Sequence, residues 1–128
     1  MRTMNRKRLG AMLAIGITST VIAAASPAQA APSCRYGTSY TRGAFVSVTM
    51  CTEDGQTWGD YQLYDKEKDG RRAELYFRYN GSSVKFDEVL TGGGTDTGLV
   101  TFFIWASGIQ FRACTSDANF GRVCDSWR

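Results

Sequence analysis

The chain has no histidine, only two prolines among its 128 residues, and no Cys-x-x-Cys pair among its four cysteines. Without imidazole it lacks the usual general base of serine and cysteine hydrolases and the commonest nitrogen ligand of zinc. Four separated cysteines also do not match a zinc or thioredoxin-like motif. These absences predict a protein without enzymatic activity, bound metal or cofactor.

Acidic residues are missing from the first thirty positions. Four basic residues within the first eight positions precede an apolar run over 9–25 and the small-residue sequence Ala28-Gln29-Ala30. This order is typical of a secretory signal peptide, and the run is shorter than the roughly 20 apolar residues of a membrane span. We therefore predict a signal helix over 1–30 that is cleaved on export, followed by one secreted, extracellular domain over 31–128.

The exported part has little net charge. The whole chain has 15 Lys+Arg and 12 Asp+Glu, and residues 1–30 hold four of the basic residues and no acidic ones. Residues 31–128 therefore carry 11 basic and 12 acidic residues, a net charge of −1. Such a domain lacks the charge excess that attracts nucleic acid or anionic membranes. We predict no nucleic-acid partner and no membrane association after cleavage.

All four cysteines lie in this exported part: Cys34, Cys51, Cys114 and Cys124. A small domain gains little stability from its core alone, and an even number of cysteines in an exported chain predicts disulfides. Three pairings are possible. We expect Cys34 to pair with Cys51 and Cys114 with Cys124, because each pair encloses one short connection near one end of the domain.

Alternation of apolar and polar residues predicts strands over 44–50 and 71–79. The dipeptide Asn80-Gly81 favours a type I′ hairpin, because both central residues of that turn need positive φ. This hairpin pairs Phe77 with Val84 and Leu75 with Phe86.

A second tight turn is predicted at Lys68-Asp69-Gly70. It places Leu63 opposite Leu75 and Tyr61 opposite Phe77, which predicts a three-stranded meander from Tyr61 to Glu88.

The segment Leu99–Ala106 is apolar on both faces, which predicts a central strand covered on two sides. Ser107-Gly108 predicts a hairpin from this strand back along 109–113, and a return strand through Val123 and Cys124 places the second disulfide between neighbouring strands. About six to eight short strands separated by turns predict an all-β fold: a small antiparallel β-sandwich, Ig-like or related, or a compact barrel.

Three motifs resemble functional sites but are better explained as turns and strand ends. The segment Asp65–Gly70 begins like a calcium loop, yet Tyr76 occupies the twelfth position, where a glutamate is required. In the acid pairs Glu53-Asp54 and Asp87-Glu88, adjacent strand residues point to opposite faces, so neither forms the carboxylate pair of a glycosidase. Gly92-Gly93-Gly94 lacks the lysine of a phosphate-binding loop.

The C-terminal sequence combines Arg112-Ala113-Cys114, a short loop, and Cys124-Asp125-Ser126-Trp127. This arrangement resembles a recurring pattern in small secreted two-disulfide β-sandwich-like proteins of high-GC Gram-positive bacteria. Such proteins have no assigned activity, so the resemblance implies export and a disulfide-linked β fold and no catalytic residue. Secreted α-amylase inhibitors with two disulfides differ, because their Trp-Arg-Tyr triplet follows the first cysteine, whereas here Trp127-Arg128 has no tyrosine after it.

Several aromatic residues do not fit the predicted apolar faces, and exposed Tyr and Trp side chains are typical of binding surfaces. The candidate binding surface consists of Tyr36, Tyr40, Trp58, Tyr64 and Tyr76, and Trp127 shares the same property. Tyr64 and Tyr76 are expected on adjacent strands, on the face away from Leu63 and Leu75, which either contributes to a binding surface or is covered by a second sheet.

Because catalytic groups are missing and aromatic residues are abundant, we predict a monomeric, non-enzymatic extracellular binding protein. Its partner is a surface glycan or another secreted protein, including an enzyme that it inhibits. The alternatives are a small carboxylate-dependent hydrolase and a secreted toxin or antimicrobial.

Overall fold

The computed structural model describes residues 31–89, 95–119 and 121–128. The expected signal peptide and the Gly92-Gly93-Gly94 segment lie outside the described residues. Within them the chain forms nine strands and no helix, and so no helix that could cross a bilayer. The strands are β1 (Ser33–Thr41), β2 (Ala44–Glu53), β3 (Gln56–Asp65), β4 (Arg72–Tyr79), β5 (Ser82–Val89), β6 (Thr95–Asp96), β7 (Val100–Ile104), β8 (Gln110–Asp117) and β9 (Gly121–Cys124).

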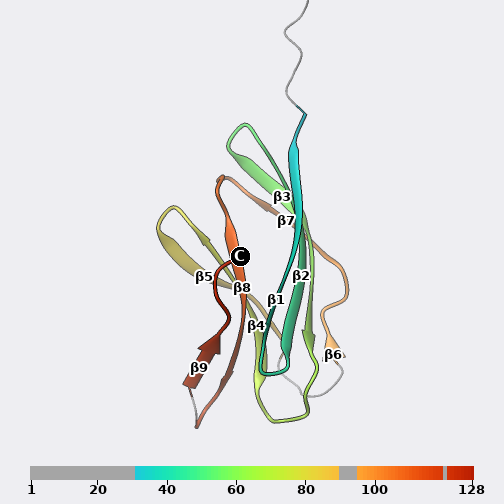
Figure 1. The fold of residues 1–128 in the computed structure, drawn as a ribbon, viewed down its shortest axis with the longest axis vertical. Helices are drawn as coiled ribbons and strands as arrows, with labels where there is room; N and C mark the ends of the chain where they lie inside the picture. Colours follow the sequence, from blue (N-terminus) through green and yellow to red (C-terminus); the bar gives the residue numbers. More distant parts are fainter. Residues whose placement is uncertain (1–30, 90–94, 120) are drawn as a thin grey trace, which may run out of the picture.

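The strands form two antiparallel sheets that pack face to face (Figure 1). Sheet A has the order β1-β2-β3, and β3 continues the sheet by pairing with both β6 and β7. Sheet B has the order β5-β4-β8-β9. The chain passes from one sheet to the other between β3 and β4, between β5 and β6, and between β7 and β8. The fold is therefore a sandwich, which decides between the two expected architectures.

One apolar core lies between the sheets, because alternate residues of each strand point inward. Val46 and Val48 of β2 and Leu75 and Phe77 of β4 are completely buried. The ring of Phe77 lies 5.0 Å from that of Phe102, so the core also joins β4 to β7. Burying a side chain of this size contributes about 1.5–3 kcal/mol, and these contacts hold the two sheets together.

Two-residue turns connect the hairpins as the turn chemistry requires. Asn80 and Gly81 both have positive φ, and Phe77 pairs with Val84, which confirms the predicted turn and that pair. Arg42-Gly43 and Asp54-Gly55 have the same backbone signs and connect β1 to β2 and β2 to β3. These turns fix the register of sheet A.

The second predicted pair of this hairpin is wrong, because the register shifts between Leu75 and Tyr76. Leu75 pairs with Asp87, and Phe86 is the extra residue at the irregularity. The ring of Phe86 nevertheless lies 4.9 Å from that of Phe77 and therefore contacts the core. A β-bulge of this kind turns an additional side chain toward one face.

The predicted meander from Tyr61 to Glu88 is also wrong. β3 belongs to sheet A and β4 to sheet B, so Leu63 and Leu75 face each other across the core instead of pairing within one sheet. Both arrangements bury the same apolar face of each strand. Alternation alone therefore does not distinguish strands that lie side by side from strands in opposing layers.

The prediction of a central strand over Leu99–Ala106 is also wrong, because the apolar pattern does not show whether a strand lies inside a sheet or at its border. β7 lies at the border of sheet A and pairs with β3, while the segment containing Ser107 and Gly108 leads into β8 of sheet B instead of forming a hairpin. Only one side of β7 is covered, by the core. Phe103 is 49% exposed and Trp105 is 74% exposed on the other side.

Both predicted disulfides are present, Cys34–Cys51 and Cys114–Cys124. Each joins directly opposite residues of neighbouring antiparallel strands, β1 with β2 and β8 with β9. After β9 the chain continues beside β8, and Arg128 exchanges backbone hydrogen bonds with Phe111.

Candidate functional site

The outer face of sheet A carries most of the predicted aromatic residues. In β2, Val46, Val48 and Met50 point into the core, so the residues between them point outward. The antiparallel register then places the outward residues of β1, β2, β3 and β7 in rows across the strands. The composition of these rows determines what this face is able to bind.

The first row, called the Trp58 row, is apolar across the whole sheet. It consists of Cys34, Cys51, Trp58 and Phe103, which are paired in that order from β1 to β7. Trp105 extends the row, because its ring lies 4.9 Å from that of Phe103 in an edge-to-face arrangement. The disulfide and three aromatic rings therefore form one continuous apolar band.

The second apolar row, called the Tyr64 row, lies toward the other end of the same strands. Tyr40 pairs with Phe45, and Phe45 pairs with Tyr64. The rings of Phe45 and Tyr64 are 5.7 Å apart. Tyr64 lies six positions after Trp58 in β3, which corresponds to about 20 Å at roughly 3.3–3.4 Å per residue.

Two rows between these bands are mainly polar. One contains Tyr36, Thr49, Asp60 and Thr101, and the other contains Thr38, Ser47 and Gln62. Tyr36 is 68% exposed and adds one ring to the first of them. Hydroxyl and amide groups dominate both rows, and Asp60 is their one charged residue. The outer face of sheet A is therefore a polar strip bordered by two aromatic rows.

The structure places Tyr36, Tyr40, Trp58 and Tyr64 on this one face, but it places Tyr76 elsewhere. Tyr76 is a residue of sheet B and is 8% exposed, so the expectation that it neighbours Tyr64 on an adjacent strand is wrong. Burial raises the pKa of its hydroxyl, and the negative charge of Glu74 adds to this effect. Tyr76 is not part of the surface formed by the other four.

Phe45, Phe103 and Trp105 belong to the same face, although they are not among the predicted surface aromatics. Phe45 alternates with the buried residues of β2, so its outward position was readable from the strand period. Phe103 and Trp105 were assigned to a covered strand. Their exposure depends on β7 lying at the border of its sheet, and no local pattern indicates this.

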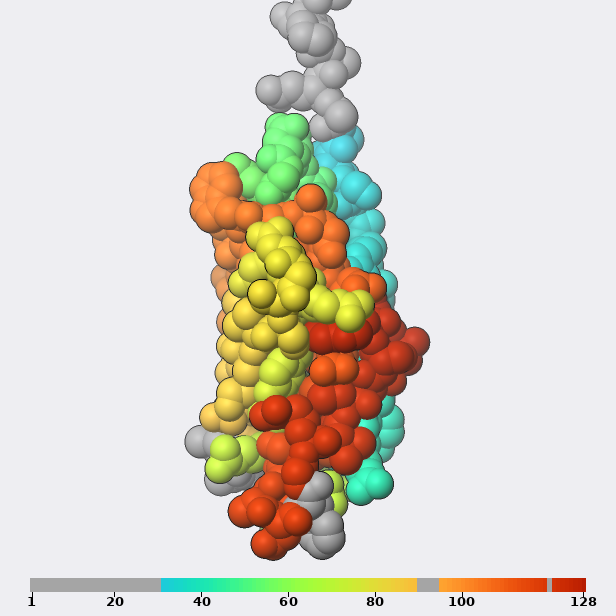
Figure 2. All heavy atoms as spheres, turned by 90° about the vertical axis from the view of Figure 1, so that its left-hand side faces the viewer, coloured from blue at the N-terminus to red at the C-terminus, as the bar shows by residue number. Residues whose placement is uncertain are grey.

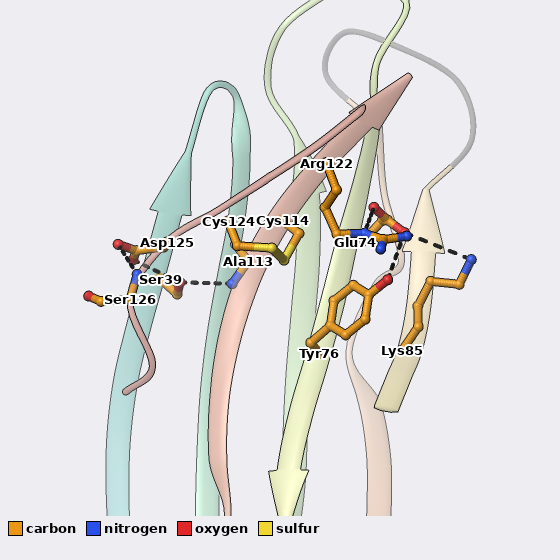
Figure 3. The surroundings of a disulfide bond; sticks show 10 residues. All are labelled: Ser39, Glu74, Tyr76, Lys85, Ala113, Cys114, Arg122, Cys124, Asp125 and Ser126. Atoms are coloured by element: carbon orange, nitrogen blue, oxygen red, sulfur yellow. Dashed lines mark hydrogen bonds and ion pairs between the residues drawn. A yellow bond between two sulfur atoms is a disulfide. The ribbon is translucent and has the colours of Figure 1, made fainter. Parts of the chain in front are cut away.

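The outer face of sheet B contains a buried carboxylate with several polar partners (Figure 3). Glu74 is 1% exposed, and its Oε1 accepts a hydrogen bond from Arg122 Nε at 3.2 Å. Lys85 Nζ lies 3.8 Å from Glu74 Oε2, and the Tyr76 hydroxyl donates to that oxygen at 3.4 Å. Burial alone raises the pKa of Glu74, but hydrogen bonds from Ser116 and Arg122 and the nearby positive charges outweigh it, so the pKa is lowered.

This carboxylate belongs to the residue directly opposite Glu88 of β5, so two acids neighbour each other on adjacent strands. Lys85 Nζ also lies 3.1 Å from Glu88 Oε2, so one ammonium bridges both acids, while Arg122 pairs with Glu74 and Arg72 with Glu88. No pocket opens on the surface of the described residues. In Figure 2, the C-terminal residues in red lie across this side of the molecule beside the yellow β5 hairpin. Glu74, Glu88 and their cationic partners therefore form an ion network over the outer face of sheet B.

The predicted acid pairs and the calcium-like segment have structural roles. Asp54 occupies the β2–β3 turn with positive φ. Asp87 points inward and accepts a hydrogen bond from the Tyr61 hydroxyl at 2.6 Å, and burial and this charged partner raise the pKa of Tyr61. Asp69 Oδ1 accepts a hydrogen bond from the backbone N–H of Arg71, as turn residues do. Across 31–89, 95–119 and 121–128, no cluster of three or more potential metal ligands forms.

The segment after β9 connects the two sheets. Asp125 Oδ2 accepts hydrogen bonds from the Ser39 hydroxyl at 2.9 Å and the Tyr40 backbone N–H at 3.1 Å, while the Ser39 oxygen accepts one from the backbone N–H of Ala113. Burial alone raises the pKa of Asp125, but these hydrogen bonds outweigh it and lower the pKa. The guanidinium groups of Arg78 and Arg112 lie 4.5 Å and 4.1 Å from the ring centre of Trp127. Trp127 therefore packs on sheet B, away from the aromatic rows.

Comparison with known proteins assigns neither a family nor a function to the chain. No protein-family model, curated protein sequence or solved structure matches the chain.

Proposed function

We propose that this chain is an exported, non-enzymatic domain that binds a glycan chain on the outer face of sheet A. The observation that carries this proposal is the order of the rows on that face: aromatic, polar, polar, aromatic. A sugar ring has an apolar face of C–H groups and a rim of hydroxyl groups. Aromatic rings stack against the former, while threonine, serine and glutamine side chains exchange hydrogen bonds with the latter.

The order of the rows favours a glycan over a protein partner. Protein interfaces usually bury aromatic anchors at the centre and place polar residues around the rim. Here the polar residues occupy the centre, and the aromatic rows lie about 20 Å apart at the two ends. An elongated, hydroxyl-rich ligand that extends along the strands satisfies both rows and the strip between them.

Export is supported by the N-terminal sequence and the two disulfides, which persist in oxidising compartments. The absence of histidine from the whole sequence and the neutralised Glu74–Glu88 pair support a binding role over hydrolysis. An exported domain has access to extracellular glycans, which are therefore available as ligands.

The proposal is tested by binding of residues 31–128 to a panel of insoluble and soluble polysaccharides, measured by pull-down and calorimetry. We expect the variants Phe103→Ala and Trp105→Ala to weaken binding about tenfold each, equivalent to about 1.4 kcal/mol. Both side chains are largely exposed, so the thermal midpoint of unfolding should remain close to that of the unaltered domain.

Val84→Ser is the matched control, because Val84 is a partly exposed apolar residue of sheet B. It should bind as the unaltered domain does. Failure of the domain to bind any polysaccharide, or equal losses in the control and the aromatic variants, would remove the proposal. Capture of a secreted protein through Phe103 and Trp105 would instead favour a protein partner.

A further inference from the structure

One lysine occupies the aromatic surface of the Tyr64 row. Lys66 directly follows β3, and its backbone N–H donates a hydrogen bond of 2.7 Å to the carbonyl of Gly43 in the β1–β2 turn. Its Nζ lies 4.3 Å from the ring centre of Phe45 and 5.6 Å from that of Tyr64. The backbone contact and the two rings hold an exposed ammonium on the outer face of sheet A.

Within the part of the chain that the structure describes, no carboxylate forms an ion pair with Lys66. The nearby acids have other contacts. Asp96 lies beyond Tyr64 on β6 and accepts hydrogen bonds from Gln62 and from the backbone of Gly98. Glu67 packs its side chain on Gly43. The ammonium of Lys66 lies over the aromatic row.

The Trp58 row has a different character. Its members are a disulfide and aromatic rings, and no cation–π contact covers Trp58, Phe103 or Trp105 among the described residues. A ligand that spans both rows therefore meets a neutral stacking surface at one end. At the other end it meets a stacking surface with the ammonium of Lys66 over its rings and the carboxylate of Asp96 at its border.

We infer that the ligand of this face is an anionic glycan, and that Lys66 selects a sugar unit with a negatively charged substituent at the Tyr64 row. This inference rests on the proposed function. The ammonium, which lies over the ring of Phe45, forms an ion pair with a carboxylate or sulfate of the sugar while the neighbouring rings of Tyr40 and Tyr64 contact its apolar face. A neutral glycan gains the stacking contacts of both rows but not this charge pair.

The test uses pairs of polysaccharides with the same backbone and with or without a charged group: polygalacturonate and its methyl ester for a carboxylate, and dextran sulfate and dextran for a sulfate. Affinity is measured by calorimetry at low and high salt with Lys66→Gln, which removes the charge at similar length. Lys66→Arg keeps the charge, and Lys68→Gln removes a nearby exposed charge of the same loop as the matched control.

We expect the unaltered domain to bind the anionic member of at least one pair about fivefold more tightly, equivalent to ~1 kcal/mol. The preference should disappear in Lys66→Gln and at high salt, and remain in Lys66→Arg and Lys68→Gln. A preference that persists in Lys66→Gln, or no preference in the unaltered domain despite glycan binding, overturns the inference and leaves the proposed function intact. Absence of binding to every glycan overturns both.

Discussion

Replacing Arg122 by glutamine tests whether the buried carboxylate of sheet B depends on its guanidinium partner. Glu74 is 1% exposed, whereas the Arg122 side chain is 47% exposed. The substitution therefore removes a charge that water solvates easily and leaves behind one that water does not reach. The cost falls on Glu74, since its remaining partners are Ser116, Tyr76 and Lys85.

The magnitude follows from these partners. A hydrogen bond to a charged group contributes about 1.5–3 kcal/mol, and a buried charge left without any partner costs about 3–5 kcal/mol. Lys85 remains 3.8 Å away, so we expect a loss near the lower range, about 2 kcal/mol. For a domain of this size that corresponds to a decrease of roughly 8–16 °C in the midpoint of thermal unfolding.

The pH dependence gives the sharper test. The pKa of Glu74 is lowered in the folded domain, so its interactions stabilise the fold at neutral pH, and this stabilisation is lost as the pH falls through that pKa. In Arg122→Gln the pKa of Glu74 rises toward its ordinary value. Consequently the difference in unfolding free energy between the two proteins should shrink from pH 7 toward about pH 3.

Urea unfolding followed by tryptophan fluorescence at several pH values measures this difference. Arg72→Gln is the control, because its partner Glu88 is 3.8 Å away and both side chains are partly exposed. It should change stability by less than about 0.5 kcal/mol. An equally small change for Arg122→Gln at pH 7, or a difference that stays constant down to acidic pH, refutes the reasoning.

Two further predictions concern stability. In Gly59→Ala the added methyl group would lie 1.9 Å from the carbonyl oxygen of Thr49, so β2 and β3 must move apart. We expect the free energy of unfolding, measured in urea, to fall by at least about 2 kcal/mol. A variant of unchanged stability would contradict this close approach. Replacing Cys34 and Cys51 by alanine opens a 17-residue loop, and replacing Cys114 and Cys124 opens a 10-residue loop. Loop entropy gives losses of about 3.1 and 2.7 kcal/mol respectively, to be compared by calorimetry, and a loss below about 1 kcal/mol for either pair would show that its loop is constrained by other contacts.

Local chemistry made part of this fold predictable. The turn at Asn80-Gly81 requires positive φ at two residues, and the cysteine pairs enclose short connections, so both followed from the sequence. Asp54-Gly55 carries the same turn signal, and reading it would have identified the β2–β3 hairpin. These features depend on a few neighbouring residues, which is why sequence reasoning reaches them.

The assignment of strands to layers was not predictable in this way. Leu63 and Leu75 are buried whether their strands pair in one sheet or face each other across two. The bulge between Leu75 and Tyr76 is accompanied by packing of Phe86 against Tyr61 and Phe102 of sheet A, a tertiary contact. Both outcomes are decided by packing between distant segments, which periodicity does not encode.

The candidate site shows the same division. Tyr36, Tyr40, Trp58 and Tyr64 were identified because they did not fit the apolar faces, and they share one surface. Tyr76 met the same criterion, yet the guanidinium of Arg122 lies 5.0 Å from its ring and the residue is buried. Long cationic side chains cover aromatic rings on the outside of a sheet, and the sequence does not show which ring is covered.

The two disulfides each stay within a single sheet, and this affects how the chain reaches its native state. Neither bond connects sheet A to sheet B. Formation of either disulfide therefore does not determine how the two sheets pack against each other. Both bonds span short stretches of sequence, and they are able to form early, before distant segments meet. The two sheets then pack through reversible noncovalent contacts. During this step the disulfides already prevent the β1–β2 and β8–β9 pairs from unfolding completely.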